Sequence, residues 1–413
     1  MKKGYLSEYF EGVAAKRLTA VETDQTCSHQ HEYNATKQML EFMGRPAERH
    51  QIPTRFLYFD DEDSEAIVED AFLTLYDSRK GQQHRGPEYR FYFPTTTVSI
   101  NATEGDLLVI AKKREGDLLV IVAENGSSIS HQIEWLFGFS DLTHPRFSVK
   151  SELETEQDRI AFASRSILEN IGILVETNAE TYLDAMLKKF EGKFPTTREF
   201  SAYARSTLKD LDAKEDRDGV LMAWMEREEI LFRTFERYLI SDRLSKGFSG
   251  EMATGVDVDG FLSYSLSVQN RRKSRVGLAL ENHLEHLFRE CSILYARGAV
   301  TENRTKPDFI FPSIDAYHNS AFDPLKLTML GVKSTCKDRW RQVLAEANRI
   351  EDKHLITLEA AISTYQTDEM AANRLQLVLP KGLHETYTSK QQTWLMDIAE
   401  FTTLVLERQQ HAD

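Results

Sequence analysis

The sequence predicts a multi-domain chain with a β-rich N-terminal part (1–150), an α-helical linker (151–260) and a C-terminal α/β part (261–413). Its 413 residues exceed what one hydrophobic core usually supports, so two or three domains are expected. The first part contains short β-branched runs, as strands do. In the second part apolar residues recur at helical spacing. The third part mixes both patterns, which predicts a sheet with helices on both faces.

Two aliphatic runs in the N-terminal part predict a β-hairpin. Residues 107–113 (LLVIAKK) and 118–124 (LLVIVAE) are joined by a charged turn, Arg-Glu-Gly-Asp. A polar, glycine-containing stretch over 77–90 follows one of the other strand candidates. Those other candidates are residues 55–59, 71–76 and 89–94.

The middle part predicts helices with defined ends. A hydroxyl residue ahead of an acidic one at 196–199 is typical of a helix start. The sequence Lys-Gly-Phe-Ser-Gly at 246–250 is typical of a helix stop and a boundary. We expect the apolar stripes of these helices to serve packing, and the whole segment to act as a hinge and a candidate dimer surface.

The C-terminal part predicts an amphipathic helix over 276–291 and a closing helix over 391–409. Between them the pattern predicts four strands and one inserted helix. The strands are expected at 307–313, 327–335, 354–360 and 374–380, and the helix at 339–350.

The charge distribution permits a nucleic-acid partner but does not demand one. A formal net charge of −14 opposes binding to phosphates. Residues 264–350, however, hold 14 Lys and Arg against 9 Asp and Glu, so this segment is basic inside an acidic chain. Such a distribution suits a DNA cleft whose outer faces repel non-specific contacts.

Composition also indicates the compartment. The chain has no run of about 18 apolar residues and no apolar signal-peptide core, so we expect no membrane span. The three cysteines (Cys27, Cys291 and Cys336) are odd in number and far apart, which favours neither a disulfide framework nor a zinc site. The cytoplasm is the expected location.

Two acids and a lysine are the candidate catalytic group. Asp308 begins one predicted strand, Lys333 lies near the end of the next, and Glu346 is expected on the following helix. Carboxylates bind Mg²⁺, which takes its other ligands from water and phosphate. A lysine ammonium beside the same phosphate neutralises charge. These residue types are common, so their spacing alone leaves a structural role open.

Three segments carry a resemblance to a known family. RRKSRVGLALENHLEHLF, VTENRTKPDFIFPSIDAYHN and LGVKSTCKDRWRQVLAEANRI closely resemble the catalytic domain of EcoRII-like type II (type IIE) restriction endonucleases, of the PD-(D/E)XK nuclease superfamily. The resemblance is dense from about 265 to 360. It implies a restriction-endonuclease-like α/β fold for this part of the chain.

The resemblance also implies roles for individual residues. Asp308 and Glu346 are expected to hold Mg²⁺, and Lys333 to be the catalytic lysine, with the second carboxylate moved from the strand to the helix in this branch. Glu281 resembles a helix glutamate that supports the metal site through water, although a solvated helix face would also explain it. Tyr317 aligns with a tyrosine near the family's active site, and function and packing are equally open for it.

Two basic groups in the C-terminal part are candidates for DNA contact. The resemblance assigns Lys337, Asp338 and Arg339 to reading outer C·G pairs, and the chemistry agrees, because Arg and Lys donate to guanine and Asp accepts from cytosine. A basic run before the predicted helix could contact phosphates or form a solvated helix start. This run consists of Arg271, Arg272, Lys273 and Arg275.

The N-terminal part resembles, over patches only, the effector-binding domain of the same family, a pseudobarrel shared with plant B-three-type DNA-binding domains. Its two DNA-gripping loops would lie at 27–33 and 78–90; polar surface loops are the alternative reading. The first loop supplies His29 and Gln30. The second supplies Arg79, Lys80, Arg85, Glu88 and Arg90.

The resulting hypothesis is a homodimeric, Mg²⁺-dependent nuclease that cuts double-stranded DNA at a CCNGG- or CCWGG-class site. Two-fold symmetry would match a palindromic site. A second, effector copy of the site would bind the N-terminal part. Two alternatives are a DNA-binding regulator with a decayed nuclease centre, and a repair or mobile-element nuclease of the same superfamily.

Overall fold

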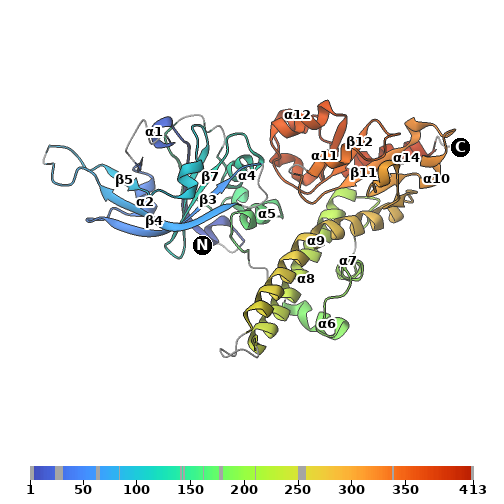
Figure 1. Ribbon diagram of the computed structural model, residues 1–413, viewed down its shortest axis with the longest axis horizontal. Helices are drawn as coiled ribbons and strands as arrows, with labels where there is room; N and C mark the ends of the chain where they lie inside the picture. Colours follow the sequence, from blue (N-terminus) through green and yellow to red (C-terminus); the bar gives the residue numbers. More distant parts are fainter. Residues whose placement is uncertain are drawn as a thin grey trace. The chain divides into compact units, whose positions relative to one another are not determined.

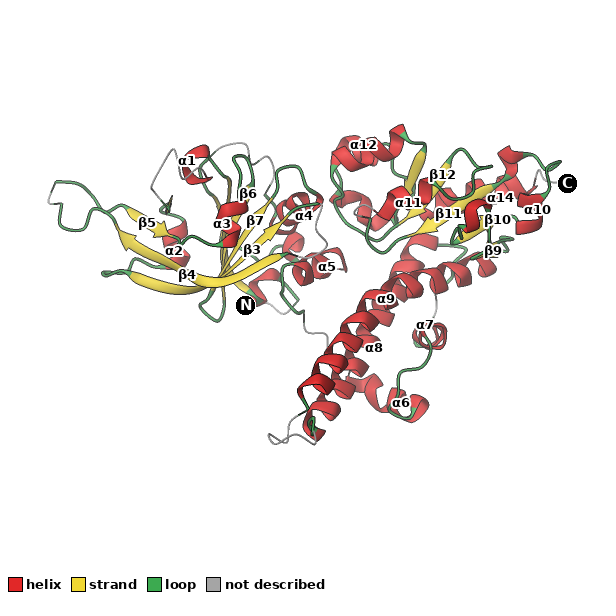
Figure 2. Cartoon of the chain, viewed as in Figure 1, coloured by secondary structure: helices red, strands yellow, loops and turns green. Residues whose placement is uncertain are grey.

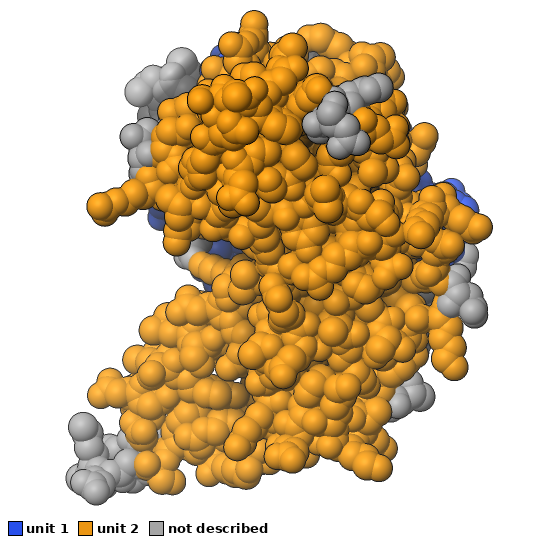
Figure 3. Space-filling model, turned by 90° about the vertical axis from the view of Figure 1, so that its right-hand side faces the viewer, with its two compact units in different colours: residues 1–175, 360–366, 386–388 blue, residues 176–359, 367–385, 389–413 orange. Residues whose placement is uncertain are grey.

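The computed structural model forms two compact units, shown in blue and orange in Figure 3. The first unit comprises residues 1–175, 360–366 and 386–388, and the second comprises residues 176–359, 367–385 and 389–413. The structure describes residues 4–23, 31–61, 66–82, 84–139, 142, 145–160, 162–175, 180–209, 211–249, 257–336 and 339–410.

An eight-stranded sheet forms the body of the first unit (Figures 1 and 2). The strands lie in the order β2-β5-β4-β3-β7-β6-β1-β8, and all neighbours are antiparallel except β3 and β7. Their bounds are β1 Phe10–Arg17, β2 Glu32–Asn34, β3 His50–Phe59, β4 Ile67–Asp77, β5 Tyr89–Tyr92, β6 Leu107–Lys113, β7 Leu118–Ala123 and β8 Ser148–Lys150.

The predicted hairpin is confirmed, since β6 and β7 pair in register from Leu107↔Ala123 to Lys112↔Leu118. The three other strand candidates correspond to β3, β4 and β5. Short helices accompany the sheet: α1 Ala20–Thr23, α2 Met39–Met43, α3 Thr97–Asn101, α4 Ser128–Phe137 and α5 Phe162–Asn170.

The sheet curls so that its two edges approach one another. Tyr33 on edge strand β2 and Phe147, next to the opposite edge strand β8, contact edge-to-face with ring centroids 6.5 Å apart. The Lys16 ammonium lies over both rings. No backbone pairing joins β2 to β8 in the described part of the chain, so closure into a pseudobarrel stays a prediction.

Four helices begin the second unit: α6 Glu180–Phe190, α7 Thr197–Ser206, α8 Arg217–Lys246 and α9 Val258–Glu290. The predicted helix start is confirmed, because Thr196 and Glu199 form a reciprocal capping box. The predicted stop is also found, since α8 ends at Lys246. The 33-residue helix α9, however, runs through position 261, where the sequence suggested a boundary.

The structure corrects the role of Arg275, which the sequence offered as a phosphate contact. Its side chain is only 7% exposed and lies between α8 and α9, with Glu228 3.5 Å away and Glu229 hydrogen-bonded to it. Burial raises the pKa of Glu229, but the charges of Arg275 and Arg233 outweigh this and hold it below its ordinary value. Arg275 therefore joins the two helices and does not face solvent.

A mixed five-stranded sheet, in the order β13-β12-β11-β10-β9, follows the helices. β11, β12 and β13 are parallel, whereas β10 pairs antiparallel with both β9 and β11. The strands are β9 Ala296–Arg297, β10 Phe309–Phe311, β11 Thr328–Val332, β12 Lys353–Ile356 and β13 Leu375–Val378. The later helices are α10 Ile314–His318, α11 Trp340–Leu344, α12 Thr364–Ala372, α13 Ser389–Gln392 and α14 Ile398–Gln410.

Helices cover both faces of this sheet, as predicted. Phe311 of β10 packs against Phe288 of α9 and Phe401 of α14, with ring centroids 5.3 and 5.8 Å apart. By the pairing register Gly331 of β11 faces the opposite side. There, Val343 of α11 comes within 2.9 Å of the position that a Cβ on Gly331 would occupy. Glycine at this position lets α11 approach the strand closely.

Two predicted helices are shorter than expected. The helix expected over 339–350 spans only Trp340–Leu344. The closing helix, expected over 391–409, begins at Ile398 because Asp397 and Glu400 cap each other's backbone amides. In the described residues, no helix is long and apolar enough to cross a membrane.

We expect Arg275→Met to lower the free energy of unfolding by about 3–5 kcal/mol, because it removes the buried guanidinium that pairs with the carboxylates of Glu228 and Glu229. Lys246→Met is the control: its exposed pair with Asp242 on α8 should contribute no more than about 1 kcal/mol. Urea denaturation measures both values. Equal losses would show that Arg275 is not a buried partner.

Candidate active site

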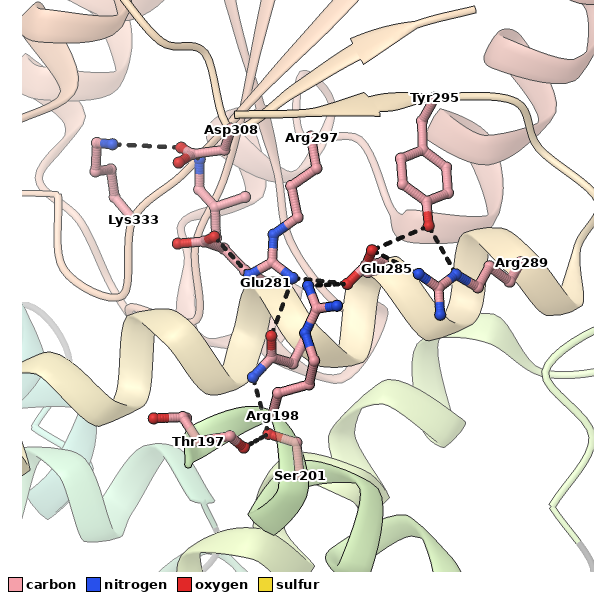
Figure 4. Close-up of polar contacts among 12 residues, drawn as sticks. Thr197, Arg198, Ser201, Glu281, Glu285, Arg289, Tyr295, Arg297, Asp308 and Lys333 are labelled. Carbon is pink, nitrogen blue, oxygen red and sulfur yellow. Dashed lines mark hydrogen bonds and ion pairs between the residues drawn. The ribbon is translucent and has the colours of Figure 1, made fainter. Parts of the chain in front are cut away.

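Strand pairing brings Asp308 and Lys333 together. Asp308 immediately precedes β10 and Lys333 immediately follows β11, and these strands are antiparallel neighbours. Asp308 Oδ2 accepts a hydrogen bond from the Val332 amide at 2.6 Å and lies 3.4 Å from Lys333 Nζ (Figure 4). Both side chains are 20% exposed. Two of the three predicted catalytic groups therefore lie together, partly buried, at the ends of two neighbouring strands.

Glu346 lies just beyond α11 and not on it, which corrects the prediction. The chain turns here, and Ala347 adopts a left-handed conformation with φ of 49°. Lys353 Nζ donates to the backbone carbonyls of Leu344, at 2.8 Å, and of Glu346 itself. This ammonium therefore fixes the turn that carries the glutamate.

Electrostatic interactions connect Glu346 to Asp308 and Lys333. Burial raises its pKa; the positive charge of Lys333 opposes this rise and the negative charge of Asp308 adds to it. Its Oε2 atom is buried and has no hydrogen-bond partner among the described residues. The three predicted groups thus lie within electrostatic reach of one another.

Glu281 of α9 is a third carboxylate at this position. Burial raises its pKa, an ion pair with Arg297 opposes the rise, and the charge of Asp308 adds to it. The ion pair, Arg297 Nη2 to Glu281 Oε2, measures 2.8 Å, and the side chain of Glu281 is 21% exposed. Glu281 is therefore a half-buried, paired group and not a solvated acid on a helix face.

Asp308 and Glu346 are suitable ligands for a divalent cation. Within the described ranges, no group of three or more His, Cys, Asp or Glu side chains is arranged to hold a metal ion. Mg²⁺ commonly takes only one or two protein carboxylates and completes its shell with water and phosphate. The buried, unpartnered oxygen of Glu346 fits such an ion, since a cation would compensate its charge.

Of the two roles left open for Tyr317, its placement supports packing. The ring is fully buried, its hydroxyl donates to Glu302 Oε2, and the Arg349 amide donates to it at 3.3 Å. Burial and the bond to Glu302 raise its pKa to about 12. Tyr317 thereby anchors the segment that follows Glu346.

The candidate base-reading triplet is described only in part. Lys337 and Asp338 lie outside the described residues. Arg339 is exposed and directly precedes α11. In the basic run before them, the Arg271 guanidinium lies 4.6 Å from the ring centroid of Phe194, and Lys273 is exposed.

Arg272, in the same run, is half exposed and pairs with the buried Glu236 at 2.7 Å. Like Arg275, it therefore contributes to the packing of α8 and α9. Its exposed fraction of 48% leaves part of the guanidinium open to solvent.

The second predicted DNA-gripping loop joins β4 to β5 in the first unit. Arg79 and Arg90 both reach Glu88, at 3.0 and 3.3 Å, and Lys80 pairs with Glu48. Arg85 is exposed. The structure brings donors and an acceptor together on this loop; His29 and Gln30 of the other loop lie outside the described residues.

Sequence reasoning missed Arg297, which contacts Glu281 directly. This arginine reaches α9 from a two-residue strand, through the pairing of β9 with β10. No spacing motif connects residues 281 and 297, so only the folded arrangement identifies the contact.

A known family model matches the C-terminal half of the chain. Residues 232–402 match the family model described as EcoRII C terminal. The type II restriction enzyme EcoRII of Escherichia coli is 41% identical over 210 residues, covering 51% of this chain and 50% of that enzyme. The chain thus spans about half the length of the curated relative it matches.

Solved structures with a similar arrangement include metal-depleted Ecl18kI in complex with uncleaved, modified DNA. It shares 17% identity, over 57% of this chain and 86% of that chain, with a TM-score of 0.45. A complex of restriction endonuclease PspGI with substrate DNA shares 17% identity, over 53% of this chain and 95% of that chain, with a TM-score of 0.42.

We expect Glu346→Gln to raise the melting temperature at neutral pH in the presence of a chelator. The folded pKa of Glu346 lies above its ordinary value of 4.5, so keeping the carboxylate ionised costs stability at higher pH. The advantage should shrink as pH falls through the raised pKa of the folded state and disappear below pH 4.5, where the glutamate is protonated in both the folded and the unfolded state.

Thermal unfolding followed by circular dichroism at the two pH values measures this difference. Glu351→Gln, at a glutamate whose side chain is 78% exposed, is the control and should change little. An unchanged or lower melting temperature of Glu346→Gln at neutral pH would contradict the expectation.

Proposed function

We propose, on the premise that residues 232–402 belong to the EcoRII C-terminal family, that this chain is a type II site-specific deoxyribonuclease. It would hydrolyse double-stranded DNA at a short CC/GG-flanked site, CCNGG or CCWGG, with Mg²⁺ as cofactor and the cytoplasm as compartment. The observation that carries the proposal is the contact between Asp308 and Lys333, whose charges both act on the buried Glu346.

The residues divide the chemistry among them. Asp308 and Glu346 would hold Mg²⁺. Such an ion neutralises phosphoryl oxygens and acidifies water. Lys333 Nζ, kept near the scissile phosphate by Asp308 Oδ2, would stabilise the negative charge that develops there. Glu281, on α9, lies close enough for the charge of Asp308 to act on its carboxylate. It would therefore accept hydrogen bonds from water at the same centre.

Base reading would involve the residues between β11 and α11. Arg339, with Lys337 and Asp338, would supply donors and an acceptor for the outer C·G pairs in the major groove. This segment lies between Lys333 and Glu346 in the chain. The base-reading residues would therefore be coupled directly to the catalytic residues. Two copies related by a two-fold axis would place one centre on each strand of a palindromic site.

The first unit would bind a second copy of the site as an effector. Its β4–β5 loop offers Arg79, Lys80, Arg85 and Arg90 as donors beside Glu88 as an acceptor. Such a mixture supports contacts to phosphates and to base edges together. His29 and Gln30 would contact the same DNA.

Digestion of a phage genome with Mg²⁺ tests the enzymatic assignment. We expect discrete fragments from the wild-type protein and none from Asp308→Ala, because the substitution removes a metal ligand and the partner of Lys333. Fragment ends mapped by sequencing should share one CC/GG-flanked site. Specific DNA binding without cleavage would instead support a regulator with a decayed centre, and a smear would indicate an unspecific nuclease.

Short duplexes that carry the mapped site test effector control. We expect them to stimulate cleavage of a plasmid with a single site. Arg79→Ala combined with Arg90→Ala should abolish the stimulation, because both arginines flank Glu88 on the loop. Duplexes with a scrambled site are the control. Indifference of the wild-type rate to the cognate duplex would refute the effector role of the first unit.

A further inference from the structure

Arg297 occupies a central position between the mixed sheet and α9. It lies on β9, where it pairs with Phe309, the residue directly after Asp308. Its side chain is 17% exposed, and its guanidinium points at one turn of α9 (Figure 4). There it contacts Glu281 at 2.8 Å, Asn282 at 3.0 Å and Glu285 at 2.7 Å.

These contacts fix the guanidinium before any ligand arrives. Glu285 also accepts hydrogen bonds from a second arginine, Arg289, at 2.7 Å and from the Tyr295 hydroxyl at 3.2 Å. It also receives Arg198 of α7 at 3.1 Å. Asn282 is in turn tied to α7 through its bond to Ser201. Glu285 therefore serves as an anchor that two helices and a strand hold in place.

Glu281 has only one of its carboxylate oxygens engaged. Arg297 binds Oε2, whereas Oε1 has no hydrogen-bond partner among the described residues. A glutamate side chain has three rotatable bonds, and an arginine fork that bridges two acceptors restricts them. The second oxygen is thus left available on a carboxylate that lies within electrostatic reach of Asp308 and Lys333; Figure 4 draws the three side chains together.

We propose that Arg297 is a positioning residue for the nuclease centre, acting through Glu281. It holds the Glu281 carboxylate toward Asp308 and Lys333 and transmits the rigidity of the Glu285 anchor to that centre. The inference rests on the proposed function. Lysine cannot replace it, because an ammonium lacks the planar fork that bridges Glu281 and Glu285 together.

A double-mutant cycle tests the proposal. Arg297→Lys should lower the single-turnover cleavage rate, or raise the half-saturating Mg²⁺ concentration, by roughly 10- to 100-fold, as loss of partners that orient metal-site groups does. In a Glu281→Gln background the same substitution should have little further effect, because the carboxylate through which Arg297 acts is already absent. Additive losses in the double variant would overturn the proposal.

Arg289→Lys is the matched control. Arg289 binds the same Glu285 but not Glu281, and its side chain is 59% exposed. It should therefore lose far less activity than Arg297→Lys, because Arg297, Arg198 and the Tyr295 hydroxyl still hold Glu285. A loss equal to that of Arg297→Lys would mean that the network only maintains the fold, which would also overturn the proposal. Glu285→Gln offers a second variant, because it loosens Arg297 without altering either Arg297 or Glu281.

A measurement without catalysis separates binding from chemistry. The half-saturating Ca²⁺ concentration for binding of a fluorescent cognate duplex, followed by anisotropy, should rise in Arg297→Lys and rise far less in Arg289→Lys. Wild-type Ca²⁺ dependence in Arg297→Lys would overturn the proposal. Failure of the wild-type protein to cleave DNA with Mg²⁺ is a different result, which would refute the proposed function and the inference together.

Discussion

The repulsion between partly buried carboxylates, in which Asp308 acts on both Glu346 and Glu281, is the constraint on which the candidate site depends. Burial raises the pKa of both Glu346 and Glu281, and Asp308 adds its repulsion to each. Lys333 and Arg297 offset this cost only in part. Asp308 lies immediately before β10, Glu346 in the turn after α11, and Glu281 on helix α9. These elements thus keep together acidic groups whose charges repel one another.

Different kinds of interaction hold each acid. Backbone pairing places Asp308, since the end of β11 donates the Val332 amide to it. Hydrogen bonds to the backbone place Glu346, through Lys353. Side-chain ion pairs place Glu281, through Arg297. Three different kinds of contact therefore hold the three acids.

Those parts of the fold that follow local rules could be predicted from the sequence. The β6–β7 hairpin and the capped start at Thr196 depend on neighbouring residues, and both are found. Asp308 and Lys333 were predicted together because strand ends are visible in the apolar pattern.

Features that depend on packing between distant segments could not be predicted. Arg275 lies in a basic run that looks solvated until α8 supplies its partners. Glu346 falls outside α11 because Lys353, at the start of β12, binds the backbone carbonyls of Leu344 and Glu346 and holds them in a turn. Helix α9 carries Arg275, which packs against α8, and Glu281, which belongs to the candidate site. At 33 residues this helix is about 50 Å long. A fragment that started at position 261 would therefore begin inside this helix and lack α8, leaving apolar surface and buried charges uncovered. An autonomous piece of this protein has to include the whole helical hairpin, even though the segment that matches the EcoRII C-terminal model starts within α8.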